Sequence, residues 1–172
     1  MILNPTYFRR WRLFFLKFHA MSNTFTQLYF HLVFATKHRD GSIHSSWRQE
    51  LHKYITGIVQ NKGHRMFAIN SMPDHLHMFI SMKPDQSISS LVQTVKSESS
   101  KWIKEILNCK HFCWQEGFGA FTNSKSQISK VVSYIENQQE HHRKRTFLEE
   151  YKHMLLQWGI EFDEKYIFKD PV

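Results

Sequence analysis

The chain has few of the residues that mark secreted, zinc-binding or membrane-spanning proteins. Only two of its 172 residues are cysteine, Cys109 and Cys113, and with His111 they supply three of the four ligands that a structural zinc site needs. We therefore expect two reduced thiols in a cytoplasmic protein. No apolar run approaches the length of a transmembrane helix, and the run Leu13–Leu16 is too short for the centre of a secretory signal.

Proline, glycine and repeated sequence are also scarce. The chain holds four prolines and six glycines, and we find no linker, internal repeat or low-complexity tract. A chain of this length suits one domain with its own core. We predict a single domain over residues 21–172, preceded by an N-terminal basic extension, residues 1–20, that is not part of the fold.

Positive charge is in excess, with 23 Lys and Arg against 15 Asp and Glu and a formal net charge of +8. This favours an anionic partner, nucleic acid first and a membrane surface second. Residues 1–20 carry four basic residues and no acidic one, and the regular pattern begins at Met21. We interpret Met21 as the natural start; the alternative is a basic arm that contacts DNA.

Hydrophobic periodicity predicts the order β-α-β-β-α-β-α-α. This order fits an α+β, ferredoxin-like split βαβ sandwich, with one antiparallel sheet, helices on one face and the other face free for a partner. Further helices at the C-terminal end follow. The predicted elements are a strand from Thr24 to Ala35, a helix capped by Ser46 and ending near Asn61, strands Arg65–Ser71 and His75–Met82, a helix from Pro84–Ser87 to Ile106, a strand Phe112–Thr122, a helix from Ser126, and a last helix from Phe147 to Trp158.

The first candidate site is the pair His75 and His77 in the third predicted strand. Residues two apart on a strand point the same way, so both imidazoles can bind one cation while Leu76 faces the core. Because the chain has 12 histidines, such a pair can also arise by chance. Two polar side chains in a core strand nevertheless need partners, and a metal is one.

The second candidate site is Tyr134 with Gln138. Four residues apart on the predicted helix, they share a face, and Tyr134 lies off the stripe of Val131, Val132 and Ile135. The alternative is a surface tyrosine that packs against the sheet edge. Gln138 also has competitors for its role in Gln139, His141 and His142.

Together the two sites describe one chemistry. A phenol has a pKa near ten and is a poor nucleophile at neutral pH, but it can attack a phosphodiester that a cation polarises. Two neutral imidazoles from His75 and His77 and the carbonyl of Gln138 form a site for Mg²⁺ or Mn²⁺, with Mn²⁺ the better match for imidazole. A covalent link to Tyr134 would keep the phosphodiester energy, so the strand could be rejoined.

Several segments resemble one family, the insertion-sequence-200-like transposases, which are single-tyrosine HUH endonucleases. Pro-Asp-His-Leu-His-Met-Phe-Ile resembles the His-hydrophobic-His motif, and Ser-Tyr-Ile-Glu-Asn-Gln-Gln-Glu-His-His resembles the tyrosine helix. The segment that opens at Gln27, the segment Leu91-Val-Gln-Thr-Val-Lys-Ser and the segment Trp114-Gln-Glu-Gly-Phe-Gly-Ala-Phe-Thr are also similar to the family. The resemblance runs from about Thr24 to Arg145, in the same order and spacing.

The resemblance implies a transposase that acts on single-stranded DNA with hairpins, in the cytoplasm of a bacterial or archaeal cell and associated with the nucleoid when acting. Tyr134 would form a 5′-phosphotyrosine link and release a 3′-hydroxyl, and His75, His77 and Gln138 would hold the metal. It also implies a homodimer in which one subunit's tyrosine helix can complete the other's site. Phosphate contacts are expected from lysines on the predicted helices, namely Lys96, Lys101 and Lys130.

Three alternatives stay open at this point. A domesticated relative would process hairpins of short genomic repeats. A non-catalytic domain would bind nucleic acid on its sheet and would not need the Tyr134 hydroxyl. A metal hydrolase with water as the nucleophile would form no covalent adduct with DNA.

Overall fold

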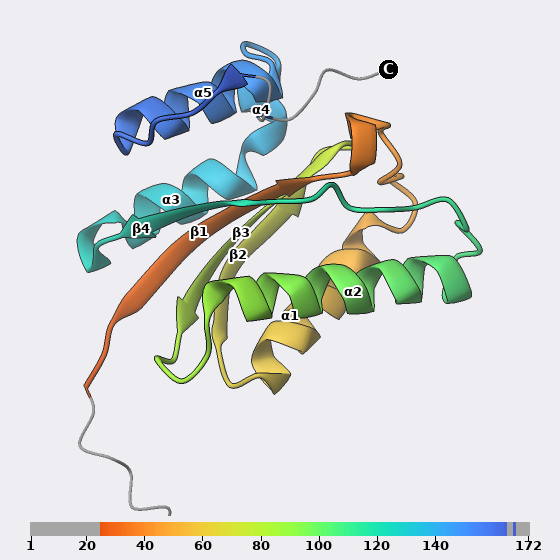
Figure 1. Cartoon of the computed structure of the whole chain (residues 1–172), viewed down its shortest axis with the longest axis horizontal. Helices are drawn as coiled ribbons and strands as arrows, with labels where there is room; N and C mark the ends of the chain where they lie inside the picture. Colours follow the sequence, from red (N-terminus) through yellow and green to blue (C-terminus); the bar gives the residue numbers. More distant parts are fainter. Residues whose placement is uncertain (1–24, 165–166, 168–172) are drawn as a thin grey trace, which may run out of the picture.

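The computed structural model describes residues 25–164 and 167, so the predicted extension, residues 1–20, lies outside the described residues. Short 3₁₀ turns at Lys37–Arg39 and Lys125–Gln127 accompany the regular elements. These elements are, in order, β1 (Leu28–Ala35), α1 (Arg48–Asn61), β2 (Arg65–Ser71), β3 (His75–Met82), α2 (Ile88–Ile106), β4 (Gly119–Asn123), α3 (Ile128–Glu136), α4 (Gln138–His142) and α5 (Phe147–Gln157) (Figure 1).

The four strands form one antiparallel sheet in the order β2-β3-β1-β4. β3 lies between β1 and β2, which is the arrangement of a split βαβ unit. The predicted α+β, ferredoxin-like fold is therefore confirmed. In the register of the central pair, Val33 lies opposite His77 and Ala35 lies opposite His75, so β1 lines one side of the histidine pair.

One face of the sheet packs against α1 and α2 and holds the larger hydrophobic core. Leu76, Met78 and Ile80 of β3 point into this core and are fully buried. Because side chains alternate across a strand, the residues between them, His75, His77 and Phe79, point to the opposite face. Burial of the three apolar side chains therefore holds both histidines on one side of the sheet.

The opposite face is covered by the C-terminal helices, so the prediction of a free sheet face is wrong. Figure 1 shows α1 and α2 on one side of the sheet and α3, α4 and α5 on the other. Val33 and Phe121 from the sheet pack there against Phe147 and Tyr151 of α5. The physical reason is that this face also carries apolar residues, whose removal from water favours a second layer of helices.

Several boundaries differ from the prediction; for example, the strand predicted from Thr24 is regular only from Leu28. The predicted strand Phe112–Thr122 is regular only from Gly119, because Trp114 makes an isolated bridge and Gly117 has a φ of +77°, which interrupts an extended strand. The predicted cap Ser46 is not the N-cap of α1. That position is Trp47, whose side chain makes no capping hydrogen bond.

Cys109 and Cys113 are free cysteines. Within residues 25–164 and 167, no helix has both the length and the apolar character needed to cross a bilayer.

Gly119 of β4 lies close against Tyr151 of α5. A Cβ atom at this position would lie 2.8 Å from both Cε2 and Oη of Tyr151. We expect Gly119→Ala to lower the free energy of unfolding by about 1–3 kcal/mol, because the ring must shift in a packed interface. As a control, Gly57→Ala in α1 has nothing within 4 Å and should raise it by about 0.5–1 kcal/mol. Urea denaturation measures both, and equal effects would contradict the close approach.

Because His52 is buried, we expect the folded protein to lose stability in acid. Its Nε2 lies 2.9 Å from the Ser71 hydroxyl, and burial, assisted by the charge of Arg48, lowers its pKa from 6.5 to about 4. The unfolded chain therefore binds a proton here below pH 6.5 and the folded chain binds one only near pH 4. This contribution to stability is present above pH 6.5 and is lost as the pH falls to about 4.

The matched variant His52→Gln isolates this contribution. Between pH 6.5 and 4.5 the free energy of unfolding of the wild type should fall more steeply than that of the variant, by up to about 1.4 kcal/mol per pH unit. Urea denaturation followed by circular dichroism at each pH measures both slopes. Parallel slopes would show that His52 keeps an ordinary pKa.

Candidate active site

His75 and His77 project from β3 toward the C-terminal helices, with their ring centroids 5.2 Å apart. Both side chains are buried, with exposed fractions of 1% and 0%. The His75 ring stacks on Phe147 at a centroid distance of 3.8 Å. Both rings therefore lie on one face of the sheet, as predicted. Their role in holding a metal stays a prediction.

Asp74 orients His75. Its Oδ1 lies 2.7 Å from Nδ1 of His75, and its other oxygen accepts hydrogen bonds from Arg39 at 2.8 and 2.9 Å. Burial alone would raise the pKa of Asp74, but the bonds with His75 and Arg39 lower it to about 2. A carboxylate here keeps the proton of His75 on Nδ1. The lone pair on Nε2 of His75 then points away from Asp74, into the site.

His31 of β1 performs the corresponding task for His77. His31 Nε2 lies 2.9 Å from His77 Nδ1, and burial lowers the pKa of His31 to about 3, so the ring is neutral. A neutral His31 that accepts a hydrogen bond at Nε2 places the proton of His77 on Nδ1. Nε2 of His77 then keeps a free lone pair. That Nε2 is buried and has no hydrogen-bond partner among the described residues.

The predicted tyrosine helix is broken at Asn137, whose φ and ψ of −95° and 21° separate α3 from α4. Tyr134 therefore lies in α3 and Gln138 begins α4, so the prediction that the two residues share a face of one continuous helix is wrong. Gln138 is fully buried, whereas Gln139 is exposed, so the burial pattern favours Gln138 over Gln139. Gln138 Oε1 lies 2.9 Å from His142 Nε2, within hydrogen-bond distance.

α5 adds a carboxylate that the sequence interpretation did not include. Glu150 is 8% exposed; its Oε1 accepts a hydrogen bond from Gln138 Nε2 at 3.1 Å, and its Oε2 lies 3.0 Å from His142 Nε2. Four side chains each offer one possible ligand atom, and these atoms all lie within 4.8 Å of one another: His75, His77, His142 and Glu150. Together they could hold a metal ion. The sequence feature that could have indicated Glu150 is an acidic residue among the apolar positions of the last helix.

Tyr134 lies beside this cluster in the same chain. Its ring centroid is 6.0 Å from that of His77, 5.8 Å from that of His31 and 4.9 Å from that of His141. The hydroxyl is buried and has no hydrogen-bond partner among the described residues. A phenol hydroxyl in that position is free to engage a ligand that enters the site.

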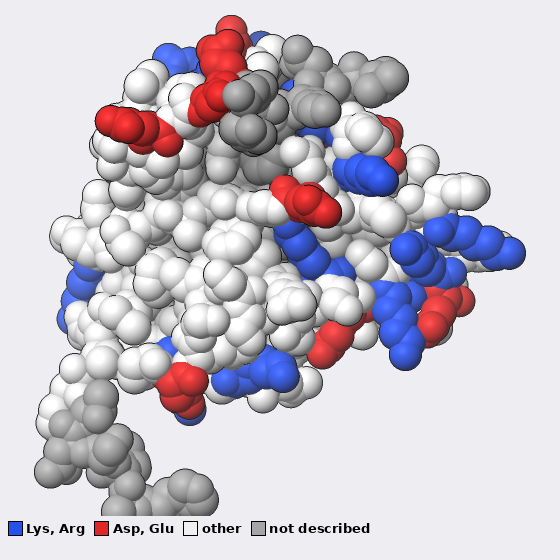
Figure 2. Space-filling model, viewed as in Figure 1, with Lys and Arg blue, Asp and Glu red and all other residues white. Residues whose placement is uncertain are grey.

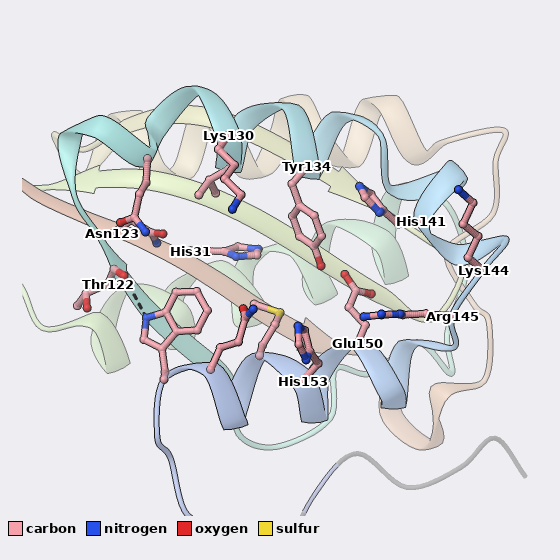
Figure 3. A pocket seen from close by; sticks show the side chains of 15 residues that line it. His31, Thr122, Asn123, Lys130, Tyr134, His141, Lys144, Arg145, Glu150 and His153 are labelled. Carbon is pink, nitrogen blue, oxygen red and sulfur yellow. Dashed lines mark hydrogen bonds between the residues drawn. The ribbon is translucent and has the colours of Figure 1, made fainter.

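A cleft of about 850 Å³ opens beside Tyr134, between α3 and α5. Figure 3 shows Lys130 and Tyr134 projecting from α3 on one side and Glu150 and His153 projecting from α5 on the other. Lys144 and Arg145 line the same cleft. Three cationic side chains around a buried hydroxyl form a site suited to a phosphate-containing ligand.

The other two predicted phosphate contacts lie elsewhere. Lys96 and Lys101 are on α2, across the sheet from His75. The Lys96 ammonium donates hydrogen bonds to the carbonyls of Gln115 and Gly117, and burial lowers its pKa to about 8. Lys101 is exposed, and Figure 2 shows Lys and Arg side chains gathered where α2 ends. The structure therefore brings Lys130 alone of the three lysines to the cleft.

The chain is similar in sequence to known proteins. Residues 24–138 match the model of a family described as transposase IS200 like. The ISDra2 transposase TnpA of Deinococcus radiodurans is 26% identical over 121 residues, which cover 66% of this chain and 86% of that protein. A transposase for insertion sequence element IS200 from Salmonella typhimurium is 25% identical over 127 residues, covering 70% and 83%.

Two solved structures share the fold. A crystal structure of a protein from Deinococcus radiodurans R1, described as a transposase, has a TM-score of 0.56 and 24% identity, and the similarity covers 68% of this chain and 95% of that one. A REP-associated tyrosine transposase bound to a REP hairpin has a TM-score of 0.55 and 16% identity, covering 82% and 87%. At these identities the structures establish the architecture of the sheet and its helices.

Proposed function

The chain belongs to the family of IS200-like transposases, and we propose that it cuts and rejoins single-stranded DNA with Tyr134 as the nucleophile. Membership implies an enzyme that processes DNA. One observation carries the finer proposal: the Tyr134 hydroxyl is buried, has no hydrogen-bond partner among residues 25–164 and 167, and lies beside two histidines whose Nε2 atoms face the same site.

We propose that His75, His77 and Gln138 hold a divalent metal, Mg²⁺ or Mn²⁺. The fit rests on the buried, unpartnered Nε2 of His77 and on the tautomer that Asp74 imposes on His75. When bound there, the cation polarises the scissile phosphate and stabilises the charge that develops on it. Imidazole donors favour Mn²⁺ over Mg²⁺.

In the proposed reaction, the Tyr134 oxygen attacks the phosphorus of a phosphodiester in the strand. As the new P–O bond forms, the bond from phosphorus to the 3′ oxygen breaks. The tyrosine gives up its proton to solvent and the leaving 3′ oxygen takes one from solvent, so a 5′-phosphotyrosine and a free 3′-hydroxyl are formed. A 3′-hydroxyl that later attacks the phosphotyrosine reverses these steps. Because the covalent link keeps the energy of the original bond, rejoining needs no ATP.

The cleft supports single-stranded DNA as the substrate. Lys130, Lys144 and Arg145 line it, and we propose that Lys130 contacts a backbone phosphate. Lys96 and Lys101 stay predicted contacts for DNA that reaches α2. We further propose that the strand carries a hairpin, as in the REP hairpin complex of the structural relative, and that two copies of the chain form a homodimer.

The test is a covalent adduct. Full-length protein is incubated with labelled single-stranded hairpins in Mn²⁺, in Mg²⁺ and in EDTA, and the products are run on a denaturing gel. We expect a protein–DNA adduct in metal and none in EDTA. Cleavage without an adduct would instead indicate water as the nucleophile, and hairpin binding without cleavage would indicate a binding domain.

A further inference from the structure

Two side chains at the histidine pair come from a part of the chain beyond the family match. The match ends at residue 138, whereas His142 ends α4 and Glu150 lies in the first half of α5. Glu150 is buried in a helix whose neighbouring inward residues, Phe147 and Tyr151, are apolar. A carboxylate in such a stripe needs a partner of opposite charge or a donor.

The spacing of the donor atoms is that of ligands around one ion. Ligand atoms at about 2.0–2.3 Å from a common metal lie roughly 3–4.5 Å from one another. His142 Nε2 is 3.0 Å from His75 Nε2 and 3.0 Å from Glu150 Oε2, and His77 Nε2 is 3.9 Å from Glu150 Oε1. All four side chains therefore present an atom to one small volume.

Hydrogen bonds alone do not account for this arrangement. His142 Nε2 lies within hydrogen-bond distance of His75 Nε2, Gln138 Oε1 and Glu150 Oε2, yet one ring nitrogen carries at most one proton. If His75 Nε2 and His142 Nε2 both carry lone pairs, they repel. His77 Nε2, fully buried, has no hydrogen-bond partner among the described residues. A cation among these atoms satisfies all of them.

We propose that His142 and Glu150 extend the metal site of this chain, so that three imidazoles and one carboxylate bind the ion together with Gln138. The inference deepens the proposed function and rests on it for the location of the metal. Gln138 also orients Glu150, since its Nε2 donates to Glu150 Oε1. The additional imidazole nitrogen shifts the preference of the site further toward Mn²⁺ and away from Mg²⁺, whereas the carboxylate suits both ions.

Metal binding by the full chain, without DNA, tests the proposal. Isothermal titration with Mn²⁺ should give a dissociation constant at least about tenfold higher for Glu150→Gln and for His142→Gln than for the wild type. Glu140→Gln and His141→Gln are the matched controls, because both side chains are exposed neighbours outside the cluster. They should bind Mn²⁺ as the wild type does. Wild-type affinity in Glu150→Gln and His142→Gln would overturn the proposal.

Pulsed electron paramagnetic resonance of Mn²⁺ bound to the wild type gives a second readout that needs no variant to fold. Nitrogen couplings from three imidazoles support the proposal, and couplings from two overturn it. Three couplings in a protein that forms no DNA adduct would sink the proposed function and leave this inference standing. Adduct formation by a protein whose bound Mn²⁺ shows couplings from two imidazoles would support the proposed function and overturn this inference.

Discussion

Tyr134→Phe is expected to abolish the covalent protein–DNA adduct and to reduce cleavage of a single-stranded hairpin by at least about 10³-fold, as removal of a nucleophile does in other enzymes. Phenylalanine keeps the ring, which packs among His31, His77 and His141. Only the hydroxyl is lost, and it makes no hydrogen bond with the described residues. DNA affinity and Mn²⁺ affinity should therefore stay within about twofold of the wild type.

Tyr54→Phe is the matched control for this loss. Tyr54 stacks on Trp102 at a centroid distance of 5.1 Å, in the core on the other face of the sheet. The same chemical change there should leave adduct formation intact. An adduct that persists in Tyr134→Phe and disappears on replacement of another residue would assign the nucleophile elsewhere, and cleavage that persists without any adduct would favour a water nucleophile.

His75→Ala is expected to have the second large effect, the joint loss of metal binding and cleavage. The substitution removes one donor atom and the ring that Asp74 orients. Mn²⁺ binding measured by titration should weaken at least about 100-fold, and the adduct should fall below detection at metal concentrations that saturate the wild type. It also empties the space against Phe147, so the free energy of unfolding should fall as well.

Circular dichroism and hairpin binding separate the loss of metal from a loss of fold. A folded His75→Ala protein that still binds the hairpin and does not cleave it supports the metal role. His111→Ala, at an exposed position before β4, controls for the loss of a histidine and should bind Mn²⁺ normally. Wild-type cleavage by His75→Ala would remove this residue from the metal site.

Much of the fold follows from local sequence patterns. Alternation along residues 75–82 predicts a strand, and it also requires His75 and His77 to share a face because side chains repeat with period two. The order of strands and helices leads to the split βαβ sheet, since short connections and antiparallel pairing leave few other arrangements. These predictions depend on neighbours within about ten residues.

The composition of the site depends on contacts that no local pattern carries. Glu150 is 73 residues from His77 and meets it only because α5 folds back onto the face of the sheet that had been expected to be free. His31 was recognised as a strand residue, but its contact with His77 depends on the pairing of β1 with β3. The two lysines on α2 were separated from the site by the same layering.

Local periodicity predicts the class of fold, the shared face of His75 and His77, and the helix that carries Tyr134, because each depends on periodicities of two or 3.6 residues. Which further groups surround the histidine pair depends on packing between segments far apart in the chain. Hydrophobic burial is nondirectional, so the apolar residues of α5 indicate that the helix packs somewhere. Close packing against Val33, Phe121 and Gly119 determines where, and with it the position of Glu150.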